Sequence, residues 1–159
     1  MLLILLAGCQ SEKPTDIKSS PDHKQNIQYL VADTICYDVV IRNRNPDDAW
    51  ETQRMKGLRH NRLMDSIFCL VYEERTEADD YFTNELISAR ELQKMEKSGD
   101  FSRESIGKIQ FAERWYFDKS GACMQKEILT ITLGHELYTD SGEFRGYKPI
   151  FKLKLNSCN

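Results

Sequence analysis

The chain has 159 residues, of which 22 are basic and 25 are acidic, and its formal net charge is -3. Because charges of both signs are interspersed along the sequence, no strong field would draw the protein to nucleic acid, and we expect no nucleic-acid partner. About 130 residues follow residue 28, which is the usual size of one domain.

The sequence begins with an apolar run that ends in small residues and a cysteine, Met1-Leu-Leu-Ile-Leu-Leu-Ala-Gly-Cys9. A secretory signal needs about 7 to 15 apolar residues, whereas a membrane-spanning helix needs about 20. The segment Leu6-Ala-Gly-Cys9 resembles a bacterial lipobox, in which the cysteine receives a diacylglycerol and becomes the new N-terminus. We therefore expect a signal peptide over residues 1–8 and lipidation of Cys9.

Several acyl chains make a stable anchor, whereas one chain holds only marginally. The sequence therefore predicts a cell-envelope lipoprotein that faces the periplasm or the cell surface, with the outer membrane favoured. The alternative is that residues 1–8 form a buried strand or helix. Because no basic residue precedes Lys13, the sequence leaves open whether the natural start lies upstream.

Residues 10–28 are rich in Ser, Pro, Lys, Asp and Gln, and Ile17 and Ile27 are their only apolar residues. Such a segment cannot bury enough surface to offset its ordering entropy. We expect residues 9–28 to form a flexible tether, with His23 in solvent, and residues 29–159 to form a single domain.

Four cysteines follow the tether. In an oxidising compartment they permit two disulfides in three possible pairings, which the sequence does not distinguish. Metal sites and redox sites commonly use C-x-x-C pairs, and the chain has none, so we expect no metal and no cofactor. One of the four lies in an apolar helical stretch, where a buried free thiol is the commoner outcome. The candidate disulfide residues are Cys36, Cys69, Cys123 and Cys158, and the helical one is Cys69.

The first half of the domain is predicted to contain a strand-like segment and two helices. Residues 29–41 are rich in β-branched and aromatic side chains and favour an extended segment, and Trp50 is expected to be a packing anchor. Residues 61–74 have the apolar spacing of a helix with one buried face. The apolar positions are Leu63, Ile67, Leu70 and Val71.

A second helix is expected over residues 89–98, after a short extended piece at residues 81–83. Ser88 and Glu91 have the spacing of a capping box, and Gly99 lies where a C-terminal cap belongs.

The last third of the chain has the period of strands. We expect strands over residues 109–117, 124–133 and 150–155, joined by turns at 118–121 and 140–146. Trp115 and Phe117 are expected to face inward, while Glu113 interrupts the apolar alternation on the same face. Three such strands form an antiparallel meander, and helices on one face complete an α+β fold with one solvated, lysine-bearing face.

No catalytic group emerges from the reactive residues. His135-Glu136 begins like a zinc-protease motif, but Thr139 occupies the position of the second histidine, and His60 is expected in solvent. A carboxylate cluster lacks the central glycine and alternating ligands of a calcium loop, so a solvated turn is favoured. That cluster consists of Glu73, Glu74, Glu77, Asp79 and Asp80.

Two C-terminal segments, Arg114-Trp-Tyr-Phe-Asp-Lys119 and Gly142-Glu-Phe-Arg-Gly-Tyr-Lys-Pro-Ile-Phe151, resemble the GldN/PorN family of gliding-motility and type IX secretion proteins. Weaker similarity at Asp47-Asp-Ala-Trp50 and Asp79-Asp-Tyr-Phe-Thr83 extends the resemblance over residues 46–155. Arg145 either contacts a partner or faces water. The family-like motif residues are Trp115, Phe117, Asp118, Phe144, Arg145, Gly146, Tyr147, Pro149 and Phe151.

The resemblance implies a non-enzymatic part of an envelope machine, which in that family assembles as a periplasmic ring with a lipoprotein partner. We therefore expect a structural or assembly lipoprotein that acts through contacts with other envelope proteins, one candidate being a ring-forming lipoprotein. The alternative is a binding module for a small ligand or a glycan. A hydrolase is the third and least favoured hypothesis.

Overall fold

The computed structural model describes residues 28–119 and 121–155. These residues form one antiparallel sheet whose strand order is β1-β4-β5-β6-β2-β3. The chain order is β1 (Gln28–Val40), α1 (Ala49–Met55), α2 (His60–Tyr72), β2 (Ala78–Asp80), β3 (Leu86–Ile87), α3 (Ala89–Ser98), the 3-10 helix η1 (Arg103–Ser105), β4 (Ile106–Asp118), β5 (Cys123–Tyr138) and β6 (Phe144–Lys154). The fold is α+β, as the sequence predicts.

The predicted meander is present as β4, β5 and β6, with longer strands than expected. The second turn is shorter, because Phe144 already pairs with Tyr138 across the β5–β6 hairpin. The turn is closed by Thr139, whose N–H donates to the Glu143 carbonyl oxygen at 2.8 Å, and Gly142 has a φ of +82°. The expectation of a turn through residue 146 was therefore wrong.

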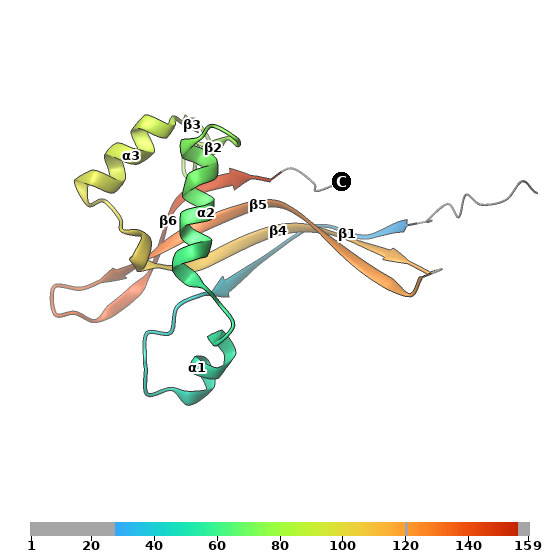
Figure 1. Ribbon diagram of the computed structural model, residues 1–159, viewed down its shortest axis with the longest axis horizontal. Coiled ribbons are helices and arrows are strands. Elements are labelled where there is room, and N and C mark those ends of the chain that lie inside the picture. Colours follow the sequence, from blue (N-terminus) through green and yellow to red (C-terminus); the bar gives the residue numbers. More distant parts are fainter. Residues whose placement is uncertain (1–27, 120, 156–159) are drawn as a thin grey trace, which may run out of the picture.

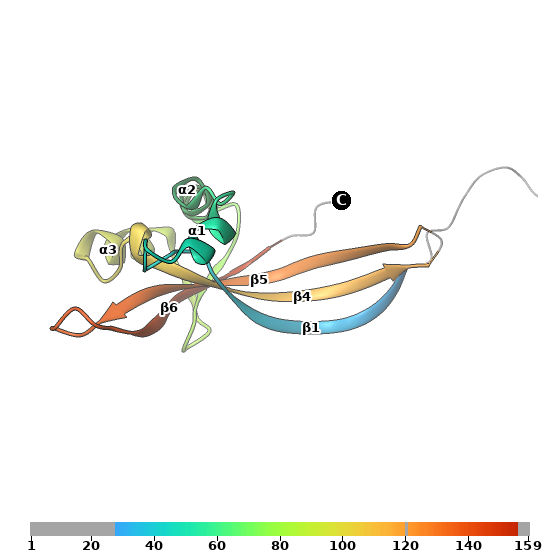
Figure 2. The same ribbon diagram turned by 90° about the horizontal axis from the view of Figure 1, so that it is seen from below.

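The helices lie on one face of the sheet, as Figure 2 shows when the sheet is viewed close to its edge. Helix α2 buries Met64, Ile67, Phe68 and Val71 against this face. Phe68 meets Phe151 of β6 edge to face, with ring centroids 5.5 Å apart. The helix was correctly predicted, but its buried stripe is centred one residue away from the predicted one.

Helix α3 has the predicted ends. Ser88 and Glu91 form the capping box, and Gly99 ends the helix with a φ of +84° in the left-handed region. The preceding segment differs from the prediction. The extended residues are those of β2, Ala78–Asp80, which come just before the predicted piece. Residues 81–83 form a turn, because Asp80 Oδ1 accepts hydrogen bonds from the N–H groups of Phe82 and Thr83, each at 2.8 Å.

Two side chains that the sequence predicts to be buried are exposed in the structure. Trp50 is 70% exposed, because the short helix α1 buries none of its residues. Cys69 also faces outward from α2, and its thiol donates to Glu73 Oε1 at 2.9 Å. An apolar stretch in a helix therefore does not imply burial of every small side chain in it.

The sheet extends well beyond its helices. In Figures 1 and 2 the first part of β1, the second half of β4 and the first half of β5 project to one side of the helical layer. We call residues 28–37, 111–118 and 123–130 the arm.

Candidate functional site

One face of the arm continues the face of the sheet that the helices cover. Phe111 packs against the hydrophobic core, and strand alternation places Glu113, Trp115 and Phe117 on the same side. Their register partners complete this surface, which we call the aromatic arm face. It consists of Tyr29, Tyr37, Glu113, Trp115, Phe117, Met124 and Lys126.

Glu113 lies at the centre of a polar cluster on this face. It is only 3% exposed, although no helix within residues 28–119 and 121–155 covers the arm. Tyr37 donates its hydroxyl to Glu113 Oε1 at 2.7 Å, and Trp115 donates its indole N–H to Oε2 at 2.9 Å. Lys126 Nζ lies 3.4 Å from Oε2 and 4.6 Å from the Trp115 ring centroid, so cation–π attraction adds to the ion pair.

Burial alone would raise the pKa of Glu113. The hydrogen bonds from Trp115 and Tyr37 and the charge of Lys126 outweigh burial, and the net effect is a pKa below the ordinary value. The carboxylate is therefore charged at neutral pH and holds the side chains of three strands in place. The same hydrogen bond raises the pKa of the Tyr37 hydroxyl.

The tip of the aromatic arm face is apolar and exposed. Tyr29 is paired with Phe117, and Phe117 is paired with Met124, so the three side chains share one face. Their exposed fractions are 46%, 37% and 50%. The expectation that Phe117 faces a core was wrong, because none of the helices that the structure describes reaches this far along the sheet. Contiguous apolar surface of this kind marks interaction sites.

The opposite face of the arm is largely polar. Arg114 Nε donates to Asp33 Oδ1 at 2.9 Å, and Tyr116 donates its hydroxyl to Glu127 Oε2 at 2.8 Å. Leu30 is an exposed apolar side chain on this side, and Val31, in the bulge of β1 next to it, is exposed as well. The arm is therefore amphipathic, with its apolar side toward the helical layer.

The outer edge of β1 is less suited to binding another strand. Register shifts interrupt its pairing with β4 on both sides of Ala32, and Thr34 has a φ of +55°. Bulges of this kind twist an edge away from regular pairing and protect it from strand addition. The face of the arm is therefore the better interaction surface.

A second polar cluster lies at the other end of the sheet. Glu136 is buried in β5, where it accepts hydrogen bonds from Arg42 and from the Tyr138 hydroxyl, the latter at 2.5 Å. The hydroxyl bond raises the pKa of Tyr138. Tyr147 of β6 is the register partner of Glu136. A Cβ added at Gly107 would lie too close to both side chains.

The family-like residues of β6 have different surroundings. Arg44 lies 3.5 Å above the Phe144 ring centroid, which anchors the segment before α1 to the β5–β6 hairpin. Arg145 is exposed, Gly146 has a φ of +149°, and Phe151 is fully buried.

Pro149 lies in a different environment from the other family-like residues of β6. It lines a pocket of about 260 Å³ with Tyr81, Phe82 and Tyr147, on the face opposite the helices, where Lys108 and Gln110 supply polar groups.

Asp118 ends β4 at the arm tip. It is buried, and its Oδ1 accepts from the N–H of Gly121 at 3.3 Å. This contact closes the turn that the sequence predicts between the first two strands of the meander.

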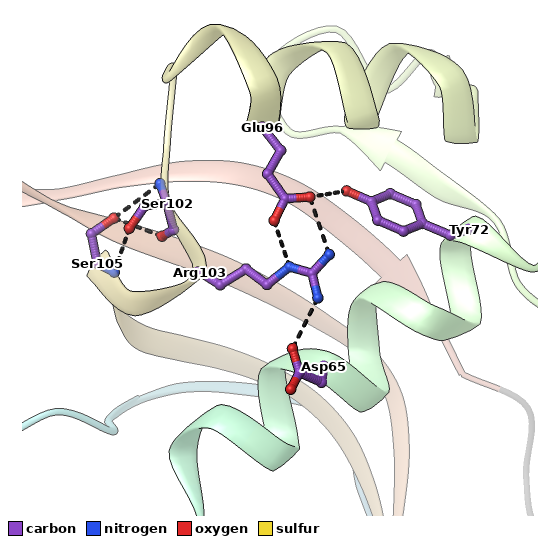
Figure 3. A network of polar contacts seen from close by, with 6 residues as sticks. All are labelled: Asp65, Tyr72, Glu96, Ser102, Arg103 and Ser105. Carbon is purple, nitrogen blue, oxygen red and sulfur yellow. Dashed lines mark hydrogen bonds and ion pairs between the residues drawn. The ribbon is translucent and has the colours of Figure 1, made fainter.

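Figure 3 shows a third cluster, which joins helices α2 and α3 to the 3-10 helix η1. Arg103 Nε donates to Glu96 Oε1 at 2.5 Å, and Arg103 Nη1 donates to Asp65 Oδ1 at 2.9 Å. Burial and the hydrogen bond to Glu96 raise the pKa of Tyr72 to about 12. The guanidinium carbon also lies 4.5 Å from the Phe68 ring centroid, so this network is structural.

The two histidines that the structure describes make different contacts. His60, expected in solvent, is half-buried, and its Nε2 donates to the Ile106 carbonyl oxygen at 2.6 Å. His135 lies in β5, where burial and the nearby charge of Lys148 lower its pKa. Within residues 28–119 and 121–155, no group of three His, Cys, Asp or Glu side chains is placed to hold a metal ion.

The cysteines in the described part of the chain, Cys36, Cys69 and Cys123, are free and exposed. Cys158, Cys9, the predicted signal peptide and His23 lie outside the described residues. The predicted tether lies there too, except that its last residue, Gln28, begins β1.

Sequence reasoning identified Trp115 and Phe117 but missed the roles of Tyr37 and Lys126. Glu113, a charged residue in an otherwise apolar alternation, was the feature of the sequence that could have indicated a polar cluster on this face. No known family model matches the chain, and comparison with characterised proteins finds no match. In the part of the chain that the structure describes, no helix is long and apolar enough to cross a membrane.

Proposed function

We propose that this protein is a non-enzymatic lipoprotein of the cell envelope that acts as an assembly component through protein contacts. The observation that carries the proposal is the aromatic arm face. Tyr29, Phe117 and Met124 present apolar surface at the end of a projecting sheet, and the cluster around Glu113 holds the base of that surface in one conformation. A rigid, preformed apolar face lowers the entropic cost of binding a partner.

The proposed location rests on the sequence. The run that ends at Cys9 has the pattern of a lipoprotein signal, and an acylated Cys9 would keep the domain at a membrane surface. The resemblance to the GldN/PorN family supports an assembly role in gliding motility or type IX secretion. One of the two segments that carry the resemblance, residues 114–119, lies at the end of β4 in the arm, and the other, residues 142–151, lies in the β5–β6 turn and on β6.

The anchor is tested by Cys9→Ser. The variant should move from the membrane fraction to the soluble fraction and keep the wild-type thermal unfolding midpoint. Persistent membrane attachment of the folded variant would show that another element holds the protein.

The assembly role is tested by crosslinking in the native envelope. A photoreactive amino acid at Met124 should give a defined adduct with another envelope protein, and this adduct should be lost in Cys9→Ser. Leu86 provides the matched control because it is 64% exposed and lies in β3, away from the arm. A protein that gives no adduct from Met124 and migrates as a monomer in mild detergent extracts would contradict the proposal.

The pocket beside Tyr81 and Phe82 favours a second candidate function, a binding module for a small ligand or a glycan. Aromatic walls with nearby polar groups are typical of such sites. The variant Phe82→Ala would weaken ligand binding in that case and would leave the Met124 adduct unchanged.

A further inference from the structure

The aromatic arm face has the dimensions and chemistry to bind a helix from another protein. We propose that its partner is an amphipathic α-helix with an apolar stripe and acidic residues beside that stripe. This inference rests on the proposed assembly role and specifies the partner that the arm recognises.

The face of the sheet that the helices cover continues onto the arm. Within the body of the protein this face is covered by α2, whose Phe68 packs on Phe151. Along the arm the same face carries Trp115, Phe117 and Met124 without a helix of the described chain above them (Figure 2). A helix supplied by a partner would extend the existing two-layer arrangement, which is the usual way to bury an apolar sheet face.

The length of the arm can be compared with the length of a helix. Strand β4 contributes residues 111–118 to the arm, which at about 3.3 Å per residue makes the arm about 26 Å long. A helix rises about 1.5 Å per residue, so about 18 residues would span the arm.

The exposed charge beside the aromatic rings indicates the charge of the partner. Lys126 is partly exposed and pairs with the buried Glu113, so the excess charge beside the aromatic rings is positive and comes from Lys119. Lys119 Nζ lies 5.1 Å from the Tyr29 ring centroid, and the Lys126 side chain is 46% exposed. Acidic residues on both sides of an apolar stripe would complement these lysines, whereas basic residues there would be repelled.

The same charges argue against a second copy of this chain as the occupant. A two-fold interface buries the same patch of both copies, so it would enclose two copies of Lys119 and Lys126 and would supply no exposed carboxylate from that patch in return. The bulged edge of β1 likewise disfavours pairing through that strand.

The test uses the full chain with Cys9→Ser and Trp50→Phe, which leaves Trp115 as the single tryptophan. Trp50 is exposed, so its replacement should not disturb the fold. Two helical peptides of about 18 residues are titrated, with identical leucine stripes flanked by Glu in one and by Lys in the other. The Glu peptide should change Trp115 fluorescence saturably and bind at least about 10-fold more tightly, and this preference should shrink at high salt.

Variants then locate the binding surface. The double variant Phe117→Ser/Met124→Ser should weaken binding of the Glu peptide by at least about 10-fold, while Phe82→Ser, at an aromatic residue that is 67% exposed and lies off the arm, should have no effect. A cooperative thermal unfolding transition in each variant would verify that it is folded.

Equal affinity for the two peptides would overturn the inference, as would equal weakening by Phe82→Ser. Sedimentation showing a dimer in which a spin label at Met124 is shielded would assign the face to a second copy. If the peptides fail but the Met124 adduct forms in the envelope, the assembly role stands and the helix is the wrong partner class.

Discussion

Trp115 donates its indole N–H to the carboxylate of Glu113, two residues earlier in the same strand, with 2.9 Å between the two atoms. Residues two apart in a strand share a face, so this bond bridges neighbours that strand periodicity already brings together. Tyr37 and Lys126 reach the same carboxylate from the flanking strands. The three strands of the arm are thus joined by side chains in a region that has no overlying helix.

The first prediction concerns Glu113→Gln. The amide carries no charge for Lys126 to face, and its NH2 group would stand where one of the two carboxylate oxygens now accepts a hydrogen bond, so we expect a loss of about 1 kcal/mol in the free energy of unfolding at pH 7. Because the folded-state pKa of Glu113 is lowered, its contribution is present above the ordinary value of 4.5 and is lost as the pH falls through the folded-state pKa. Urea unfolding of both proteins between pH 7 and pH 3 measures this.

The difference in stability between the wild type and Glu113→Gln should therefore shrink toward pH 3. A difference that is constant over the whole range would show that the carboxylate charge does not stabilise the arm. Glu143→Gln is a suitable control, since this exposed glutamate lies in the distant β5–β6 turn.

The second prediction concerns Gly107→Ala. An added Cβ at Gly107 would lie 2.5 Å from Glu136 Oε1 and 2.9 Å from Tyr147 Cε1, which is too close for either atom. Both neighbours are held by the sheet, so we expect a destabilisation of about 1 to 3 kcal/mol, the range for overpacking. The control is Gly57→Ala, because nothing lies within 4 Å of a Cβ at that position. Similar unfolding midpoints for the two variants would refute the close packing at Gly107.

The elements that the sequence predicted well are those fixed by local chemistry. The ends of α3 follow from Ser88, Glu91 and Gly99, whose capping interactions involve only neighbouring backbone groups. The turn after β4 and the alternation of its strand were likewise readable from nearby residues. The α+β class followed from adding these local signals.

The elements that were mispredicted depend on what lies across the sheet. Phe117 has the pattern of an inward residue, but the pattern does not tell how far along the strand the helical layer extends. Trp50 was exposed for the same reason, since α1 does not pack its tryptophan on the core. The cluster around Glu113 requires the register of β1 with β4, which depends on bulges that single-strand patterns do not reveal.

The third prediction concerns Tyr72. Its pKa is raised to about 12 by burial and by the hydrogen bond that it donates to Glu96. A raised folded-state pKa means that the contribution of Tyr72 to stability is complete below its ordinary value of 10 and is lost as the pH rises toward 12. Ultraviolet difference titration should show one phenol fewer titrating near pH 12 in Tyr72→Phe. An unchanged titration curve in that region would contradict the buried hydrogen bond.

The last prediction separates the core of the sheet from the arm by comparing Phe151→Ala with Phe117→Ala. Phe151 is fully buried against Phe68, so its truncation leaves a cavity and should cost about 3 to 5 kcal/mol in the free energy of unfolding. Phe117 lies at the arm tip and is 37% exposed, so its truncation should cost less, about 1 to 2 kcal/mol. Urea unfolding followed by circular dichroism measures both values under the same conditions. If Phe117→Ala proves as destabilising as Phe151→Ala, the arm face is covered in the isolated protein, and it cannot then be a free docking surface.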